Sequence, residues 1–151
     1  MTILKHIKRL DSITHPFLSR SNWCEEQPCW LIPVLGRELV LTQPASSFWV
    51  YLLGIQTTLI GCLFFREPNS FADLLWGVSL ILWGVGALVA GTSYQAFAYY
   101  IKCHKRAHCR WTSYWEILYL IMQQLSVNAM LAAVCIDSVT GTMRTIMLCL
   151  V

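Results

Sequence analysis

Charged residues are scarce in this sequence. Asp, Glu, Lys and Arg make up 13% of its 151 residues, about half of the ~25% that is typical of soluble domains. Hydrophobic residues make up 56% even when glycine is not counted, which is above the usual soluble range. The composition therefore argues against an ordinary soluble domain and predicts one membrane domain with room for three or four crossings.

Charge is also missing where intramembrane chemistry would need it. No Asp, Lys, Arg or His lies in the middle of the three longest apolar stretches, so these stretches offer no proton relay, metal-ligand set or Schiff-base lysine. The basic start is not followed by a continuous apolar run and a small-residue cleavage site, so a secretory signal is not expected. The net charge of +3 comes from clusters near the ends of the apolar stretches, which predicts contact with headgroups, no nucleic-acid partner and no cofactor.

The longest uncharged stretch is Leu74 to Tyr100, which exceeds the ~20 residues that a helix needs to cross a bilayer. Within it the tetrad Leu-Trp-Gly-Val occurs twice, and Gly77, Gly84 and Gly91 recur at every seventh position. This spacing keeps one stripe in line along a supercoiled helix, and glycine in that stripe lets a second helix approach closely. The pattern predicts a transmembrane helix with a partner helix.

Two further apolar stretches flank the central one. The predicted crossings are residues 46–65, 74–100 and 114–136, within a 46–151 transmembrane domain that follows a 1–45 interfacial or linker segment. Residues 143–151 are too few to cross; they either lie in the interface or begin a fourth helix of a longer protein, and we favour the second. The predicted fold class is an all-α transmembrane bundle with three full crossings and a partial fourth.

The first crossing also carries two glycines that are seven residues apart. The connection to the second crossing is short, so the two helices form an antiparallel hairpin. In such a hairpin, residues at equal depth have a constant sum of residue numbers. The pairs that share one sum are Gly61 with Gly77, Gly54 with Gly84, and Ser47 with Gly91. They predict one close-packed seam.

The segment before the first crossing is predicted to lie at the membrane surface. Residues 3–10 carry apolar and basic side chains on opposite helical faces, which fits either a short interfacial helix or a frayed basic tail. The apolar piece from Trp30 to Leu41 is interrupted by proline, glycine and charge and is too short to cross. We expect it in the interface, with Trp23 and Trp30 at the level of the headgroups.

A layer of polar side chains is predicted within the second and third crossings. Its candidates are Thr92, Ser93, Tyr94, Gln95, Gln123, Gln124 and Asn128, with Glu116 at the mouth. If residue numbers are counted outward from the loop between the two crossings, Gln123 and Gln124 lie at nearly the same depth as Gly91. Such groups usually hydrogen-bond across helices; the alternative is a polar pocket for a lipid headgroup or small solute. Glu116 is explained equally well as the acid of a helix-capping box with Ser113.

Cysteine and histidine gather in two segments that two crossings place on the same side of the membrane. They are Cys24, Cys29, Cys103, His104, His108 and Cys109. Disulfides within this cysteine set, reduced thiols and a zinc site all remain open, although neither cysteine pair has the C-x₂-C form of most zinc sites.

Cys103 and Cys109 bracket a loop that must turn back sharply, so we expect their thiols to be neighbours. A disulfide requires an oxidising compartment. The positive-inside rule instead places the basic loop between them in the cytoplasm. The orientation therefore stays open.

The second half of the chain resembles a group of uncharacterised bacterial multi-pass membrane proteins. The resemblance covers Leu82 to Arg144 and rests on the run Trp83-Gly-Val-Gly-Ala-Leu-Val-Ala-Gly-Thr-Ser-Tyr-Gln-Ala-Phe, followed by Lys102-Cys103, Cys109, Trp111-Thr-Ser and Trp115-Glu116. It implies a longer protein in the bacterial inner membrane. No activity comes with the resemblance, so no functional residue is transferred.

From these patterns we predict a multi-pass membrane protein that acts as a helix-packing or binding module. Its expected partners are membrane lipids and other transmembrane helices. The alternative is a membrane-embedded enzyme or lipid-binding protein that uses the polar layer around Gly91 to Gln95 and Gln123 with Gln124. A thiol or metal site at the surface is a third hypothesis.

Overall fold

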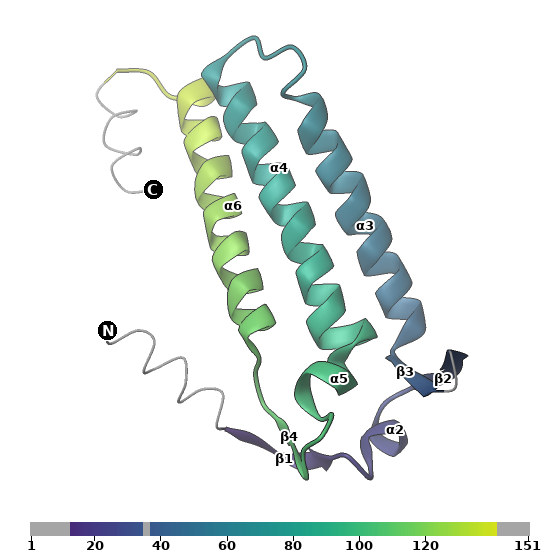
Figure 1. Ribbon diagram of the computed structural model, residues 1–151. Coiled ribbons are helices and arrows are strands. Elements are labelled where there is room, and N and C mark those ends of the chain that lie inside the picture. Colours follow the sequence, from purple (N-terminus) through teal and green to yellow (C-terminus); the bar gives the residue numbers. More distant parts are fainter. Residues whose placement is uncertain (1–12, 35–36, 142–151) are drawn as a thin grey trace. The chain divides into compact units, whose positions relative to one another are not determined.

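The computed structural model describes residues 13–34 and 37–141 (Figure 1). The predicted interfacial helix at residues 3–10 and the partial fourth crossing at residues 143–151 lie outside the described residues. The chain divides into two compact units. The first unit comprises the described residues up to Tyr51 together with Val89–Leu118, and the second comprises Leu52–Leu88 together with the described residues from Tyr119 onward.

Three described helices are long and apolar enough to cross a membrane, as the sequence predicts. They are α3 (Pro44–Leu63), α4 (Phe71–Ala90), which continues as the π-helix η1 (Gly91–Ala96), and α6 (Tyr114–Ser138). The predicted second crossing extends to Tyr100, but helical geometry breaks at Phe97, whose φ is −112°. The next turn is a separate short helix, α5 (Ala98–Lys102).

Side-chain caps fix where α4 and α6 begin. The Asp73 carboxylate accepts hydrogen bonds from the backbone N–H groups of Asn69 and Ser70, at 3.0 and 2.9 Å, and the Ser70 hydroxyl accepts one from the Asp73 N–H at 3.1 Å. This reciprocal pair is a capping box with aspartate as its acid. At α6, the Glu116 carboxylate accepts the Ser113 N–H at 3.1 Å, so Glu116 has the capping role that the sequence suggests.

In the second unit, α3 and α4 pack against each other at their glycine residues. A Cβ atom added at Gly84 would lie 2.7 Å from the Gly54 carbonyl oxygen, and one added at Gly61 would lie 3.0 Å from the Gly77 carbonyl oxygen. Distances this short leave no room for a side chain, so the backbones of the two helices are in contact. These are the two glycine pairs that the shared residue-number sum predicts.

The third predicted pair differs. Gly91 lies in the first unit, and its nearest neighbour is Val50, whose Cγ1 would be 3.0 Å from an added Cβ. Ser47 instead donates its hydroxyl to the Thr42 carbonyl at 3.1 Å. Tyr51 also lies near Gly91, with its Cε1 3.8 Å from the added Cβ.

The all-α prediction is confirmed only in part, because the first unit also contains two small antiparallel sheets. In one, β1 (Thr14–Ser19) pairs with β4 (His108–Arg110); in the other, β2 (Cys29–Val34) pairs with β3 (Arg37–Thr42). The apolar piece from Trp30 to Leu41 thus folds back on itself as a hairpin. Pro33 prevents a helix there, and the β-branched and aromatic residues on both arms favour strands.

Trp23 lies at the centre of the first unit, in the short helix α2 (Trp23–Glu26). It is 2% exposed and its indole N–H donates to the Thr42 hydroxyl at 3.1 Å. The polar end of the Trp23 ring therefore has a protein partner in β3, and the place of Trp23 at headgroup level stays a prediction. Trp30 of β2 is 63% exposed, and its place at the headgroups stays a prediction.

Candidate functional site

Cys103 and Cys109 form a disulfide, with their Cα atoms 4.3 Å apart. Both are fully buried and pack with Trp23 and Ala98 in the core of the first unit. The turn between them is tight, since the Arg106 N–H donates to the Cys103 carbonyl at 3.0 Å and Lys105 has a φ of 62°. The prediction that these two thiols are neighbours is confirmed.

The other cysteine pair is reduced. Of the described cysteines, Cys24, Cys29, Cys62 and Cys135 are free thiols, and Cys24 is exposed. The Cys24 thiol lies close enough to the Cys29 thiol to affect the pKa of Cys29. Among the described residues, no group of three or more His, Cys, Asp or Glu side chains could hold a metal ion.

Burial, followed by the neighbouring Cys24, raises the pKa of the Cys29 thiol from 9.0 to about 11. Because only the thiolate is nucleophilic, alkylation of Cys29 in the folded protein should keep accelerating up to about pH 11. In the denatured chain the rate should level off near pH 9.0, the ordinary value for this thiol. Peptide mass spectrometry after timed alkylation measures both profiles, and identical midpoints would contradict this prediction.

Lys102 and Glu116 form a buried ion pair in the first unit. The Lys102 Nζ lies 2.5 Å from the Glu116 Oε1, with side-chain exposures of 13% and 3%. The same ammonium lies 4.9 Å from the centre of the Tyr94 ring and donates to the Trp111 carbonyl at 3.4 Å. The other carboxylate oxygen of Glu116 accepts the Ser113 N–H. A cation–π contact and two hydrogen bonds therefore hold the pair in place.

A half-enclosed cavity of about 290 Å³ lies beside this pair. Its described lining is His15, Leu18, Trp23, Gln27, Gln43, Tyr94, Ala98, Lys102, Arg110 and Trp111. The β1–β4 sheet supplies His15 and Arg110, whereas η1 and α5 supply Tyr94 and Lys102. Segments far apart in sequence therefore meet around one hollow.

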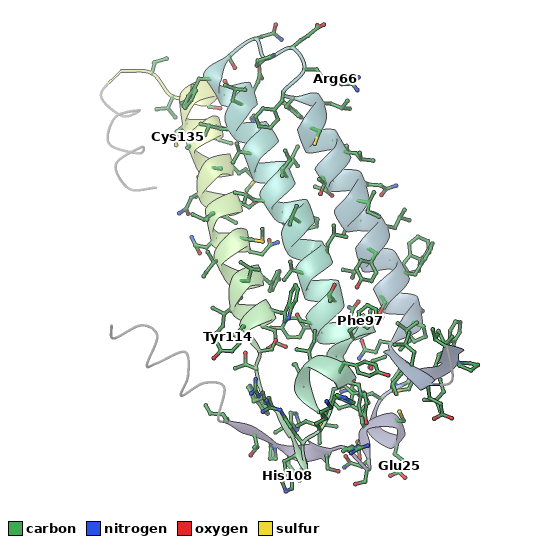
Figure 2. All side chains as sticks on the ribbon, viewed as in Figure 1. Glu25, Arg66, Phe97, His108, Tyr114 and Cys135 are labelled. Atoms are coloured by element: carbon green, nitrogen blue, oxygen red, sulfur yellow. A yellow bond between two sulfur atoms is a disulfide. The ribbon has the colours of Figure 1, made fainter. Side chains whose placement is uncertain are left out.

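His15 is held in one orientation at this cavity. Its ring stacks on Trp111 with centroids 4.8 Å apart, and its Nδ1 accepts the backbone N–H groups of Phe17 and Leu18 at 3.2 and 3.0 Å. A nitrogen that accepts carries no proton, so the Nε2 of the neutral ring is a donor. By contrast, Glu25 and His108 of the same unit point outward (Figure 2).

The residues of the predicted polar layer take part in different contacts. Tyr94 and Glu116 belong to the cavity and its ion pair. The Thr92 hydroxyl hydrogen-bonds with the Tyr51 hydroxyl at 2.8 Å, and Ser93 is buried, with its hydroxyl 3.5 Å from the Ala90 carbonyl. The Gln95 Oε1 is buried and has no hydrogen-bond partner among the described residues.

Gln123 and Gln124 were predicted to lie near Gly91, but in the second unit they contact other residues. The Gln123 amide donates to the Trp83 carbonyl at 3.3 Å, eight residues before Gly91, and Gln124 bonds within α6 to Asn128 at 2.9 Å. The count across the loop assumes one continuous helix to Tyr100. It fails because η1, the break at Phe97 and β4 use residues that do not add regular helical length.

Sequence reasoning also missed a hydroxyl pair between α4 and α6. The Ser79 hydroxyl donates to the Ser126 carbonyl at 2.9 Å, and the Ser126 hydroxyl donates to the Ser79 carbonyl at 2.8 Å. Small hydroxyl residues in apolar helices are the usual sequence sign of such a contact. Lys102 and the cavity residues of β1 were missed too, because their proximity depends on long-range pairing.

Comparisons of this chain with models of protein families, with curated proteins and with solved structures found no match. The resemblance to bacterial multi-pass membrane proteins therefore stays a prediction, and the site is interpreted from its own geometry.

Proposed function

We propose that the chain is a multi-pass integral membrane protein, crossing with α3, α4 together with η1, and α6, and that its first unit binds a small anionic group. The crossings are supported by large apolar side chains that face outward: Leu59 of α3 is 61% exposed and Leu120 of α6 is 58% exposed. Hydrocarbon solvates such surface, whereas water penalises it. The bacterial inner membrane and further transmembrane partners stay predictions.

The cavity beside Lys102 is the observation that carries the binding function. Its described lining combines two cationic side chains, Lys102 and Arg110, with no acidic one. Lys102 is paired with Glu116, and Arg110 is the second cationic side chain of the described lining. An anion is the guest that this electrostatic environment favours.

The remaining walls limit what the anion is attached to. Trp23, Tyr94 and Trp111 offer flat apolar surfaces, and Gln27 and Gln43 offer amides that can donate or accept. At about 290 Å³, the cavity is at the small end of the range for ligand sites. A phosphate or carboxylate on a small body fits this chemistry, and it can come from a lipid headgroup or from a soluble metabolite.

The Arg110→Gln variant tests this proposal. A hydrogen bond to a charged group contributes about 1.5–3 kcal/mol, so its loss should weaken anion binding at least about tenfold. Binding is followed by tryptophan fluorescence of the protein in phosphatidylcholine nanodiscs, since Trp23 and Trp111 line the cavity. The probes are glycerol phosphate in solution and phosphatidic acid in the disc, which distinguish the two sources.

The matched control is Arg106→Gln, because Arg106 is exposed on the adjacent loop and is not among the cavity residues. Binding of either probe should be nearly unchanged in this variant. Equal weakening by both substitutions would indicate general charge attraction, and absence of saturable binding for both probes would overturn the proposed function.

A further inference from the structure

Three cysteines of the first unit belong to or pack against one core cluster, and a fourth, Cys24, lies exposed at its edge. Cys29 packs against the core cluster that contains Trp23, Ala98 and both cysteines of the disulfide. Cys24 follows Trp23 directly in α2, is exposed, and lies close enough to Cys29 to affect the pKa of that thiol. The reduced pair therefore lies beside the core that contains the disulfide, with Cys29 in contact with that core.

The backbone supports both pairs on a common framework. Cys109 belongs to β4, which pairs with β1, and β1 leads through a tight turn into α2. In that turn Asn22 accepts the Ser19 N–H at 2.7 Å, and its own amide donates to the Phe17 carbonyl at 2.8 Å. The turn thus fixes α2, which carries Cys24, against the strand pair that carries the disulfide.

We propose that the two cysteine pairs form an internal thiol–disulfide exchange couple, in which the Cys24 and Cys29 dithiol takes over the disulfide from Cys103 and Cys109. The cavity ligand plays no part in this exchange, so the couple is independent of the binding function. It gives the first unit two covalent forms that contain the same atoms and differ in which segment is cross-linked.

The exchange balances without an external oxidant or reductant. The Cys29 thiolate attacks one sulfur of the Cys103–Cys109 bond, which breaks as a Cys29 mixed disulfide forms and the leaving sulfur takes up a proton. The Cys24 thiolate then attacks the Cys29 sulfur of the mixed disulfide and releases the second core thiol, which is protonated in turn. Two electrons and two protons pass from the Cys24 and Cys29 pair to the Cys103 and Cys109 pair.

Burial makes this transfer slow at neutral pH. The pKa of Cys29 at about 11 keeps it as the thiol, and both disulfide cysteines are 0% exposed. Cys103 and Cys109 therefore stay bonded, and Cys24 and Cys29 stay reduced, until the pH rises or the core opens. This predicts measurable transfer only as the pH approaches the pKa of Cys29.

The test uses the full chain in nanodiscs, with Cys62, Cys135 and Cys149 replaced by serine so that the two pairs are the only cysteines. The protein is incubated without oxygen at about pH 10.5, where a sizeable fraction of Cys29 is the thiolate, then quenched in acid, alkylated and digested. Mass spectrometry should find a Cys24–Cys29 bond together with alkylated Cys103 and Cys109, in a fraction that increases with time.

The Cys24→Ser variant makes the assay decisive, because it removes the thiol that resolves the intermediate. It should accumulate a cross-link from Cys29 to Cys103 or Cys109. The Cys29→Ser variant is the matched control and should keep the Cys103–Cys109 bond unchanged. If neither the transferred bond nor the trapped cross-link forms, the proposal is wrong; if a cross-link forms from Cys24 in the Cys29→Ser control, the assigned order of attack is wrong.

Discussion

Replacing Gly84 by alanine should destabilise the second unit by about 3 kcal/mol, at the upper end of the usual range for overpacking. The added Cβ would lie 2.3 Å from the Thr58 hydroxyl oxygen and 2.7 Å from both the Gly54 carbonyl oxygen and the Thr58 nitrogen. Two of these atoms belong to the α3 backbone, and the hydroxyl is itself bonded to the Gly54 carbonyl at 2.8 Å. The helices must therefore move apart, and the contacts along the seam weaken.

The matched control for this experiment is Gly86→Ala on the same helix. Its added Cβ would meet the Gln123 Nε2 at 2.7 Å, with the next atoms at 3.6 Å, and the end of a flexible side chain can move. Unfolding in detergent, followed by circular dichroism during titration with a denaturing detergent, compares the two variants. Equal losses of stability would contradict the close-packed glycine seam.

Removing one charge of the buried ion pair should have the second large effect. Glu116→Gln leaves the Lys102 ammonium in a buried place without its counter-charge, and breaking such a pair costs about 3–5 kcal/mol. Because the glutamine keeps the size of the side chain and an oxygen acceptor for the Ser113 N–H, the loss reports mainly on charge. The same detergent titration measures it.

A double-mutant cycle separates the ion pair from the cap. Lys102→Met removes the ammonium, and the double variant Lys102→Met with Glu116→Gln leaves no buried charge at this position. We expect the double variant to be more stable than the sum of the single losses implies, by at least about 1 kcal/mol. Strict additivity would mean that the two side chains do not stabilise each other.

Local periodicity explains what the sequence could predict. The seven-residue spacing of Gly54, Gly61, Gly77 and Gly84 lies within two adjacent helices joined by a short turn, so residue numbers alone determine the pairing. The Cys103–Cys109 bond is also local, because its sequence separation is 6. In both cases the chain between the partners is too short to allow other arrangements.

The cavity could not be predicted in the same way. His15 and Arg110 meet through pairing of β1 with β4, two strands separated by most of the chain, and neither strand has a sequence signal that names its partner. The hairpin of β2 and β3 had a local signal in its two apolar arms. The interfacial prediction for residues 30–41 used the length of this segment relative to a bilayer, and length does not reveal strand pairing.

The irregular segment that begins with the π-helix accounts for the misplaced polar layer. Gly91, Thr92 and Ser93 open η1, and a glycine followed by two hydroxyl residues weakens the regular α-helical pattern. Together with the break at Phe97 and the strand β4, η1 shifts the depth of every residue counted beyond it. This is why Gln123 contacts Trp83, whereas the α3–α4 pairs, which precede η1, are found where they were predicted.

The most direct test of the account is whether α3 crosses a membrane. Cys24 is exposed before this helix and Glu67 is exposed after it, so the test combines native Cys24 with Glu67→Cys in separate chains whose other unpaired cysteines are serine. Sealed vesicles are treated with a membrane-impermeant maleimide before and after permeabilisation. The account predicts that one of the two positions is labelled in intact vesicles and the other only after permeabilisation; labelling of both from the same side would contradict it.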